Sequence, residues 1–282
     1  MPGQLARGSL VSPVCIGPLL RPRDIAVPFR MQPGLSRSTR EACLLTPLAP
    51  DSALHAEKRA VVQARASQHA VSGFDASAAL ATIAAHSQGS FDTAHDIGER
   101  CLELCIGEDF ALVDACSASV PWMRVCVPSH WAPEDKIGLP LAAIHAPVAD
   151  SATLIRASQA LAQLVCDGHY WQRHVWTISP SPRHDQHPRR SARVPWPDAE
   201  GWALAQQCWW RVERQTFLPV PGQACSVFAI RVQLLPLVQA VADADDAARL
   251  HDALASMSDD VLHYKGLAHA RAPLLRWLQG LP

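Results

Sequence analysis

The sequence predicts an α+β protein in which helices pack on a mainly antiparallel sheet. Strand-forming segments follow one another from residue 100 onward, without the regular alternation of strand and helix that is typical of a parallel doubly wound sheet. Residues 208–218 and 225–235 are rich in Trp, Val, Phe and Leu. Only residues 219–224, which contain the turn segment Pro219–Gln223, separate them. This spacing favours an antiparallel hairpin.

Composition describes a globular chain of 282 residues, 49% hydrophobic and 18% charged, which is long enough for one large domain. Residues 1–40 are rich in Pro, Gly and Arg and lack a sustained period, so we expect a flexible arm followed by a single domain over residues 41–282. The net charge of −1 gives no overall positive potential that would attract nucleic acid. No apolar run is long enough to span a membrane. Nine scattered cysteines fit reduced thiols and a cytoplasmic location.

Most other predicted elements follow from the spacing of apolar residues and from the positions of Gly, Pro and helix-capping residues. Asp51 and Asp75 are candidate caps for helices over 51–70 and 75–86. Residues 101–106 and 110–115 flank a plausible hairpin turn. The remaining expected elements are a strand at 122–127, a Pro-rich loop at 128–148, a helix from Ser151 to near Gly168, a strand at 175–179, a long exposed loop at 180–198, and two closing helices over 243–257 and around 274–278.

The stretch Trp209–Phe217 is the most informative part of the chain. Its residues favour a strand, and at period two Arg211, Glu213 and Gln215 share one face while Arg214 falls on the other. Because a lone buried charge is very costly, charge on both faces indicates groups paired with each other or with a ligand. The alternative is an edge strand with solvated arginines and a surface ion pair.

Five short motifs occur in order along the chain. They are the Pro-rich segment 127–148, which contains Ile-His-Ala-Pro-Val, then Arg-His-Val-Trp at 173–176, Arg-Val-Glu-Arg-Gln-Thr at 211–216, Val-Phe-Ala-Ile-Arg at 227–231, and Tyr-Lys at 264–265. In this order they resemble the alpha subunit of haem-dependent oxidative N-demethylases, a family also called dimethylamine monooxygenase. The resemblance covers residues 91–280, with a looser match over 30–60.

The resemblance implies a PAS-like antiparallel sheet with packed helices enclosing a haem pocket. It implies haem b as cofactor and oxidative N-demethylation of a small alkylamine with O₂, in which hydroxylation of an N-methyl carbon gives a carbinolamine that releases formaldehyde. Electrons would come from flavin and 2Fe–2S groups on partner reductase subunits. The histidine motif continues Pro147-Val148-Ala149 where relatives usually have a second proline, and Val175 stands where they tend to have Asn, so the amine itself is not specified.

His145 is the first candidate for axial ligand of the haem iron, because it lies in an apolar, Pro-stiffened segment and neutral imidazole is a common haem ligand. The alternative is a core histidine bonded to backbone. His130 and His174 are reserves, and the polar residues Ser129 and Arg173 that precede them favour surface positions.

Glu213 and Arg211 are the candidate catalytic pair, because oxygen activation and amine binding need a proton path and a carboxylate for the ammonium group. The alternative is a structural salt bridge. Arg231 lies on the partner strand of the predicted hairpin and is a candidate for pairing with Glu213 or binding the cofactor. Arg173 is a candidate for the haem propionates, since guanidinium matches a carboxylate in geometry.

Other residues carry weaker expectations. Arg183 and His187 are further propionate candidates, although a solvated loop is the favoured reading for both. Lys136, Tyr264 and Lys265 match family positions without an assigned role. The basic residues over 183–193 are candidates for docking an acidic redox partner. Two rival functions remain: a non-catalytic haem-binding PAS-like gas or redox sensor, and an interaction module that keeps the fold without the cofactor.

Overall fold

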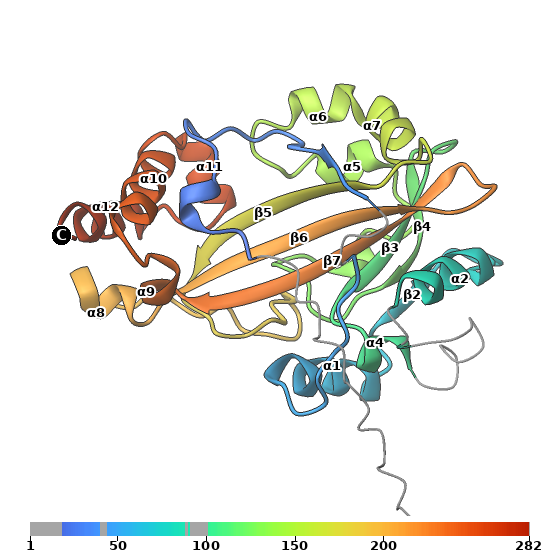
Figure 1. Ribbon diagram of the computed structural model, residues 1–282, viewed down its shortest axis with the longest axis horizontal. Coiled ribbons are helices and arrows are strands. Elements are labelled where there is room, and N and C mark those ends of the chain that lie inside the picture. Colours follow the sequence, from blue (N-terminus) through green and yellow to red (C-terminus); the bar gives the residue numbers. More distant parts are fainter. Residues whose placement is uncertain (1–18, 40–43, 88–89, 91–100, 282) are drawn as a thin grey trace, which may run out of the picture.

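A computed structural model describes residues 19–39, 44–87, 90 and 101–281. Its centre is a seven-stranded sheet in the order β1-β5-β6-β7-β3-β4-β2, in which every pair of neighbouring strands is antiparallel. Helices pack around this sheet (Figure 1), so the α+β prediction is confirmed. Within the described residues, no helix combines the length and the apolar character needed to cross a membrane.

The strands are β1 (Ser36–Arg37), β2 (Gln68–Ala70), β3 (Asp109–Asp114), β4 (Ser119–Arg124), β5 (Trp171–Ser179), β6 (Trp209–Pro219) and β7 (Cys225–Pro236). The helices are α1 (Ala53–Gln63), α2 (Ser77–His86), α4 (Leu102–Cys105), α5 (Leu141–His145), α6 (Ala152–Arg156), α7 (Ser158–Val165), α8 (Gly201–Ala205), α9 (Leu237–Ala240), α10 (Ala244–Ala255), α11 (Asp259–Tyr264) and α12 (Arg271–Gln279). Two 3-10 turns, η1 (Pro22–Asp24) and η2 (Pro133–Asp135), complete the structure.

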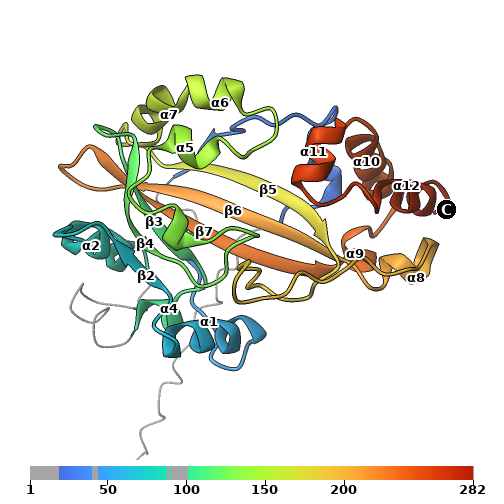
Figure 2. The same ribbon diagram turned by 180° about the vertical axis from the view of Figure 1, so that it is seen from behind.

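The two faces of the sheet are covered by different helices. One face, which we call the α5 face, packs against α5 and α7 through Leu141, Val165 and the strand residue Phe217. Figures 1 and 2 show α5, α6 and α7 grouped on one side of the strands, with α8 to α12 gathered around one end. The opposite face carries Trp176 and Trp210, whose rings stack at 4.9 Å in the core formed with α10 and α12.

The long hairpin is confirmed. β6 pairs with β7 without interruption from Trp209↔Pro236 to Pro219↔Ser226. The hairpin predicted around residues 107–109 is wrong, because Leu102–Cys105 forms α4 and β3 pairs with β4 and β7 instead. Leu102 and Ile106 are both fully buried. Leu102 in α4 and Ile106 just after it belong to one apolar cluster with Phe110 and Trp122, and this tertiary packing overrides the local preference for a strand.

Two further expectations need correction in part. α1 begins after Ser52, whose hydroxyl accepts from the His55 amide, rather than at Asp51, and the helix ends at Gln63. The loop over 180–198 was predicted to be exposed, but Asp185, Gln186 and His187 are buried. The cause is Arg190, whose guanidinium donates to the Asp185 carboxylate and to the Cys126 carbonyl and so ties the loop to the domain.

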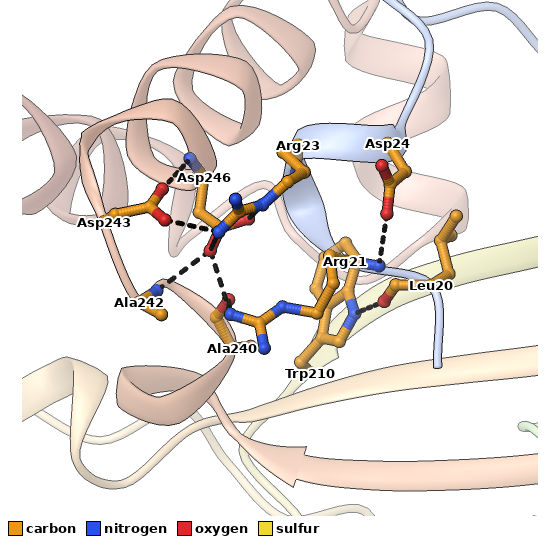
Figure 3. A network of polar contacts seen from close by, with 9 residues as sticks. All are labelled: Leu20, Arg21, Arg23, Asp24, Trp210, Ala240, Ala242, Asp243 and Asp246. Carbon is orange, nitrogen blue, oxygen red and sulfur yellow. Dashed lines mark hydrogen bonds and ion pairs between the residues drawn. The ribbon is translucent and has the colours of Figure 1, made fainter. Parts of the chain in front are cut away.

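The segment 19–37, within the predicted arm, is bonded to the C-terminal helices (Figure 3). Asp246, at the start of α10, is fully buried and accepts from Arg21 Nη2 at 2.9 Å, from Arg23 Nε at 3.1 Å and from the Ala242 amide at 3.1 Å. Trp210 Nε1 donates to the Leu20 carbonyl at 2.9 Å. We call this set of contacts the arm clasp.

We predict that Asp246→Asn lowers the free energy of unfolding by about 1–3 kcal/mol, because one amide oxygen cannot accept all these bonds and buried donors lose their partners. The melting temperature should fall, and the segment 19–37 should become more sensitive to proteolysis. The matched control is Asp245→Asn, an exposed neighbour in the same turn. Equal melting temperatures for the two variants would contradict a role of the arm clasp in stability.

The arm clasp also predicts an acid dependence. Burial raises the pKa of Asp246, but hydrogen bonds from Arg23, Ala242 and Arg21 outweigh burial and hold the pKa at about 2. The folded pKa lies below the usual value of about 3.9, so this contribution is present above pH 4 and is lost as the pH falls toward 2. Thermal melts across this range should show a smaller loss of stability in Asp246→Asn than in the unmodified protein.

Candidate functional site

The register of β5, β6 and β7 assigns each polar residue to a face. Arg173 stands opposite Gln215, and Thr177 opposite Arg211, so these four side chains and Glu213 share one face. It is the α5 face, because Phe217 continues the same alternation and its ring stacks on Phe228 at 4.6 Å beneath α5 and α7. The prediction that Arg211, Glu213 and Gln215 share a face separate from Arg214 is confirmed.

A continuous chain of hydrogen bonds runs along this face. Arg211 Nε and Nη2 donate to Ser129 Oγ at 3.0 and 2.8 Å, and the Ser129 hydroxyl donates to Glu213 Oε1. Gln215 Nε2 donates to Glu213 Oε2 at 2.7 Å, and Arg173 Nε donates to Gln215 Oε1 at 2.7 Å. Both oxygens of Glu213 are therefore held in fixed positions between the two arginines. We call these five residues the charged relay.

The remaining bonds of Arg211 explain why it is buried. Its Nη1 donates to the Arg183 carbonyl at 3.1 Å and its Nη2 to the His184 carbonyl at 2.9 Å. Burial lowers the pKa of Arg211 to about 10, and the nearby Glu213 carboxylate opposes this shift. The guanidinium therefore stays charged at neutral pH and orients Ser129 as a donor to the carboxylate.

Glu213 is the anion that favours the charged form of two further cations. Burial lowers the pKa of Arg173 and lowers the pKa of Lys265 to about 8, and Glu213 opposes the shift in both cases. Within the described part of the chain, the hydrogen bonds of Arg173 go to Gln215 Oε1 and to the Pro33 carbonyl, and Lys265 Nζ donates to the Trp176 carbonyl. Arg173 on the α5 face and Lys265 beside β5 are thus both bonded to neutral groups, with one carboxylate in electrostatic range of both.

His145 ends α5 and approaches this cluster from the helical layer. Its ring is partly buried, and Nδ1 is buried without a hydrogen-bond partner. Burial lowers the pKa of His145 and the cations Arg173 and Lys136 lower it further, while a backbone contact with Leu141 opposes the shift, so the imidazole is neutral at physiological pH. Although α5 reads Leu-Ala-Ala-Ile-His, none of its residues is fully buried, and the first five residues of β5 are only partly buried. This side of the sheet is incompletely covered.

The opposite face carries a second polar cluster, in which His174, Arg214 and Arg231 stand in a row across three strands. Arg214 Nη2 pairs with Glu108 Oε1 at 3.0 Å, and Thr46 donates to Glu108 through its amide and hydroxyl. The expected ion pair between Arg231 and Glu213 is therefore wrong, because the two side chains point to opposite faces. Arg231 is also separated from His145 and Arg173 by the sheet.

The other sequence-predicted residues lie outside the charged relay. His130 and His174 were expected at the surface. His130 is exposed, as predicted, whereas His174 is partly buried and its Nε2 is buried without a partner. His187 is buried and its Nε2 lies 3.1 Å from Glu134, while Arg183 is exposed and contributes its backbone carbonyl to Arg211. Tyr264 is 49% exposed, and Glu213 and Arg173 both act on its pKa, so it lies beside the charged relay.

Two residues of the charged relay had no predicted role. Ser129 joins Arg211 to Glu213, and Gln215 joins Glu213 to Arg173. The period of the strand places Gln215 correctly, but Ser129 comes from a loop whose path no local period specifies. Its one sequence signal is that it is the single hydroxyl residue of the Pro-rich segment 127–148.

Arg231 depends on a close contact with Gly107. A Cβ at Gly107 would lie 2.1 Å from Arg231 Nη1 and 2.6 Å from Cζ, so no side chain fits there unless the Arg231 guanidinium moves. We predict that Gly107→Ala displaces this buried guanidinium and lowers the free energy of unfolding by about 1–3 kcal/mol. The control is Gly280→Ala, where the nearest atoms lie at an ordinary 3.5 Å. Chemical denaturation measures both variants, and equal stabilities would refute the close contact.

Comparison with protein families places most of this chain in a known family. The model described as haem-dependent oxidative N-demethylase, alpha subunit-like, matches residues 77–275. The matched region runs from the start of α2 into α12 and contains β3 to β7, the charged relay and His145. It covers well over half of the chain, and the resemblance predicted from the five motifs is confirmed. The chain belongs to the family of haem-dependent oxidative N-demethylase alpha subunit-like proteins.

Proposed function

We propose that this chain binds haem b on the α5 face and acts as the monooxygenase subunit of an enzyme that removes an N-methyl group oxidatively from a small alkylamine. The family name implies haem dependence and an oxidative N-demethylase. The observation that carries the proposal is a neutral, partly buried imidazole at His145, with one ring nitrogen that has no side-chain or water partner, in electrostatic range of Arg173, the cation that ends the charged relay.

The chemistry of the residues present fits a haem. Neutral imidazole is a common axial ligand of haem iron, and one or two such ligands suffice. Arg173 and Lys265 are bonded to neutral groups, so the two propionate carboxylates would supply the anions that these cations lack. Ile144, Phe217 and Phe228 add an apolar wall. Arg231 is not part of this proposal, because it lies on the other face.

The fold is consistent with a haem-binding domain. An antiparallel sheet whose one face is incompletely covered by short helices is what a PAS-like ligand-binding domain would need. Bound haem would supply the activation of O₂. In this proposal the sheet and α5 hold the cofactor, and reductase subunits with flavin and 2Fe–2S groups deliver electrons from outside the chain.

The residues of the charged relay would act on the amine and on protons. The Glu213 carboxylate can neutralise an alkylammonium group and hold a proton at either oxygen. Ser129 and Gln215 fix the direction in which those oxygens point, and Arg211 keeps Ser129 in place. The partial exposure of Glu213, in a strand whose neighbouring residues are buried, leaves room for a small substrate to approach it.

We predict that His145→Ala abolishes haem retention, because the iron loses its protein ligand. His130→Ala and His174→Ala should keep the haem. The measurement is the intensity of the Soret band after reconstitution, compared with the melting temperature of each apoprotein. An unchanged spectrum in His145→Ala would refute the assignment, and loss of haem only in His174→Ala would move the site to the opposite face.

We predict that Glu213→Gln keeps the fold and the haem but abolishes amine turnover, because an amide neither neutralises an ammonium group nor relays a proton as a carboxylate does. Melting temperature, the amine-induced spectral shift and formaldehyde release are measured on one sample. If Glu213 serves only the fold, its removal leaves buried cations unpaired and costs about 3–5 kcal/mol in the fully buried limit. A much lower melting temperature with poor haem binding would therefore contradict the catalytic role.

The rival function, a haem-binding sensor without turnover, has one observation in its favour. Both oxygens of Glu213 are already occupied by Ser129 and Gln215, as in a purely structural network. Reconstituted protein that binds haem, receives electrons from a chemical reductant and releases no formaldehyde from any short N-methylamine would support the sensor and contradict the enzyme.

A further inference from the structure

A small cavity lies on the α5 face, next to the Arg211 end of the charged relay. Thr177 and Ser179 line it and are two residues apart in β5, so they share a face, and Thr177 stands opposite Arg211 in the sheet. His130, the residue after Ser129, lines another side. The cavity is therefore a neighbour of the charged relay, but none of the five residues of the relay lines it.

The guanidinium of Arg193 forms one wall of this cavity. Its Nη2 lies 2.2 Å from the position that a Cβ on Gly266 would take, and Gly266 itself lines the cavity. Trp196 Nε1 donates to the Gly266 carbonyl at 2.8 Å, so the segment that carries Arg193 is bonded to the same glycine. Among the residues that the structure describes, the Arg193 side chain has neither a hydrogen-bond acceptor nor an ion-pair partner. Its donors are therefore available to a ligand.

Hydroxyl groups supply further donors to the cavity. Ser179 Oγ accepts from the Ser181 amide and from Gln186 Nε2, both at 3.1 Å, so its own proton is left for a ligand. Thr177 and Ser181 bring two more hydroxyl groups to the lining. No described residue that lines the cavity carries a carboxylate. The lining is thus rich in donors and lacks an anion.

The electrostatic potential at the cavity is positive. Loss of water around part of the ring, together with the cations Arg193 and Arg211, lowers the pKa of His130 to about 4. These two cations therefore oppose any further positive charge at this place. Because like charges oppose each other where opposite charges attract, the same surroundings stabilise an anion, which a guanidinium and hydroxyl groups hold by strong, charge-assisted hydrogen bonds.

The size and shape of the cavity select among anions. Its volume is about 30 Å³. One water needs about 10–15 Å³, so the cavity accepts two or three heavy atoms. A carboxylate group has three, whereas a phosphate or sulfate group is larger. A planar carboxylate also matches the planar donor fork of a guanidinium.

We propose that this cavity binds a single carboxylate group, which Arg193 holds and the hydroxyl groups of Thr177 and Ser179 orient. The carboxylate has two possible sources. One is a free carboxylate of one or two carbons. The other is a propionate side chain of haem, and this source rests on the proposed function, because only a chain that binds haem on the α5 face brings a propionate to this place.

Formate is the probe that tests the site, because it is the smallest carboxylate. Melting temperatures of the full-length protein without haem are measured in sodium formate and in sodium chloride at the same ionic strength. We expect a saturable rise in formate only. Formate should also raise the pKa of His130 in an NMR titration, because a bound carboxylate offsets the charge of Arg193. Equal melting temperatures in the two salts would overturn the proposal.

Two variants test the place of binding. Arg193→Gln should weaken formate binding at least about tenfold, because a hydrogen-bonded charge is lost. Its control is Arg249→Gln, which removes the same charge from another exposed position and should bind formate normally. Gly266→Ala keeps the charge of Arg193 but places a Cβ where Nη2 lies, so it should also lose formate binding. Unimpaired binding by Arg193→Gln would refute the site.

Gly222→Ala is the matched control for Gly266→Ala. The two glycines have nearly the same left-handed backbone, with φ of +72° and +70°, but no atom lies within 4 Å of a Cβ at Gly222. Both variants therefore carry the same backbone strain, and only one displaces the guanidinium. Loss of formate binding in both would show an effect of strain and contradict the role of the guanidinium.

Repeating the formate titration after reconstitution with haem identifies the source of the carboxylate. A response that disappears in the haem-bound protein assigns the cavity to a propionate, and an unchanged response assigns it to a free carboxylate. Both results support the site. A protein that retains no haem would contradict the proposed function, but the titration without haem would still decide whether the cavity binds a carboxylate.

Discussion

The structure is organised by one constraint: β6 carries charged side chains on both of its faces, and each of them must find a partner in the interior. On the α5 face, Arg211 and Glu213 are joined by a hydroxyl from the loop before α5. On the opposite face, Arg214 reaches Glu108, which also accepts from Thr46. The Pro-rich loop and the chain before α1 are distant in sequence, yet both are held against β6. The reason is that burying an unpaired charge costs more free energy than ordering a loop.

The two faces meet this requirement differently. The opposite face is closed: Gly107 leaves space for the Arg231 guanidinium and nothing more, and a continuous apolar core of tryptophan and leucine follows it along the sheet. The α5 face is left partly open, with half-covered residues in α5 and β5 and a neutral histidine in electrostatic range of Arg173. A rigid face supporting an open one is the arrangement that a binding site requires, since preorganised groups need a fixed support.

Part of this could be predicted from the sequence. The period of two in β6 fixed which side chains share a face, the short turn fixed the hairpin, and Asp243 marked the start of α10. Three things depended on contacts between distant residues. The chain over 102–105 forms a helix because Leu102 and the following Ile106 pack into one distant apolar cluster. Ser129 enters the charged relay from an irregular loop, and Arg21 and Arg23 bind Asp246 across more than two hundred residues. Local patterns carry no information on such pairings.

The path of residues 29–37 has a consequence for self-association. β5 would end the sheet with a row of free backbone groups, a template for a strand of another molecule. β1 pairs with only Trp171 and Gln172, but beyond it Pro33 accepts from Arg173, Phe29 lies against the Trp176 ring, and Lys265 occupies the Trp176 carbonyl. The far border of the sheet is β2, three residues long. Both borders are thereby poor partners for intermolecular β-pairing, and loss of the segment over β5 would expose a strand able to seed aggregates.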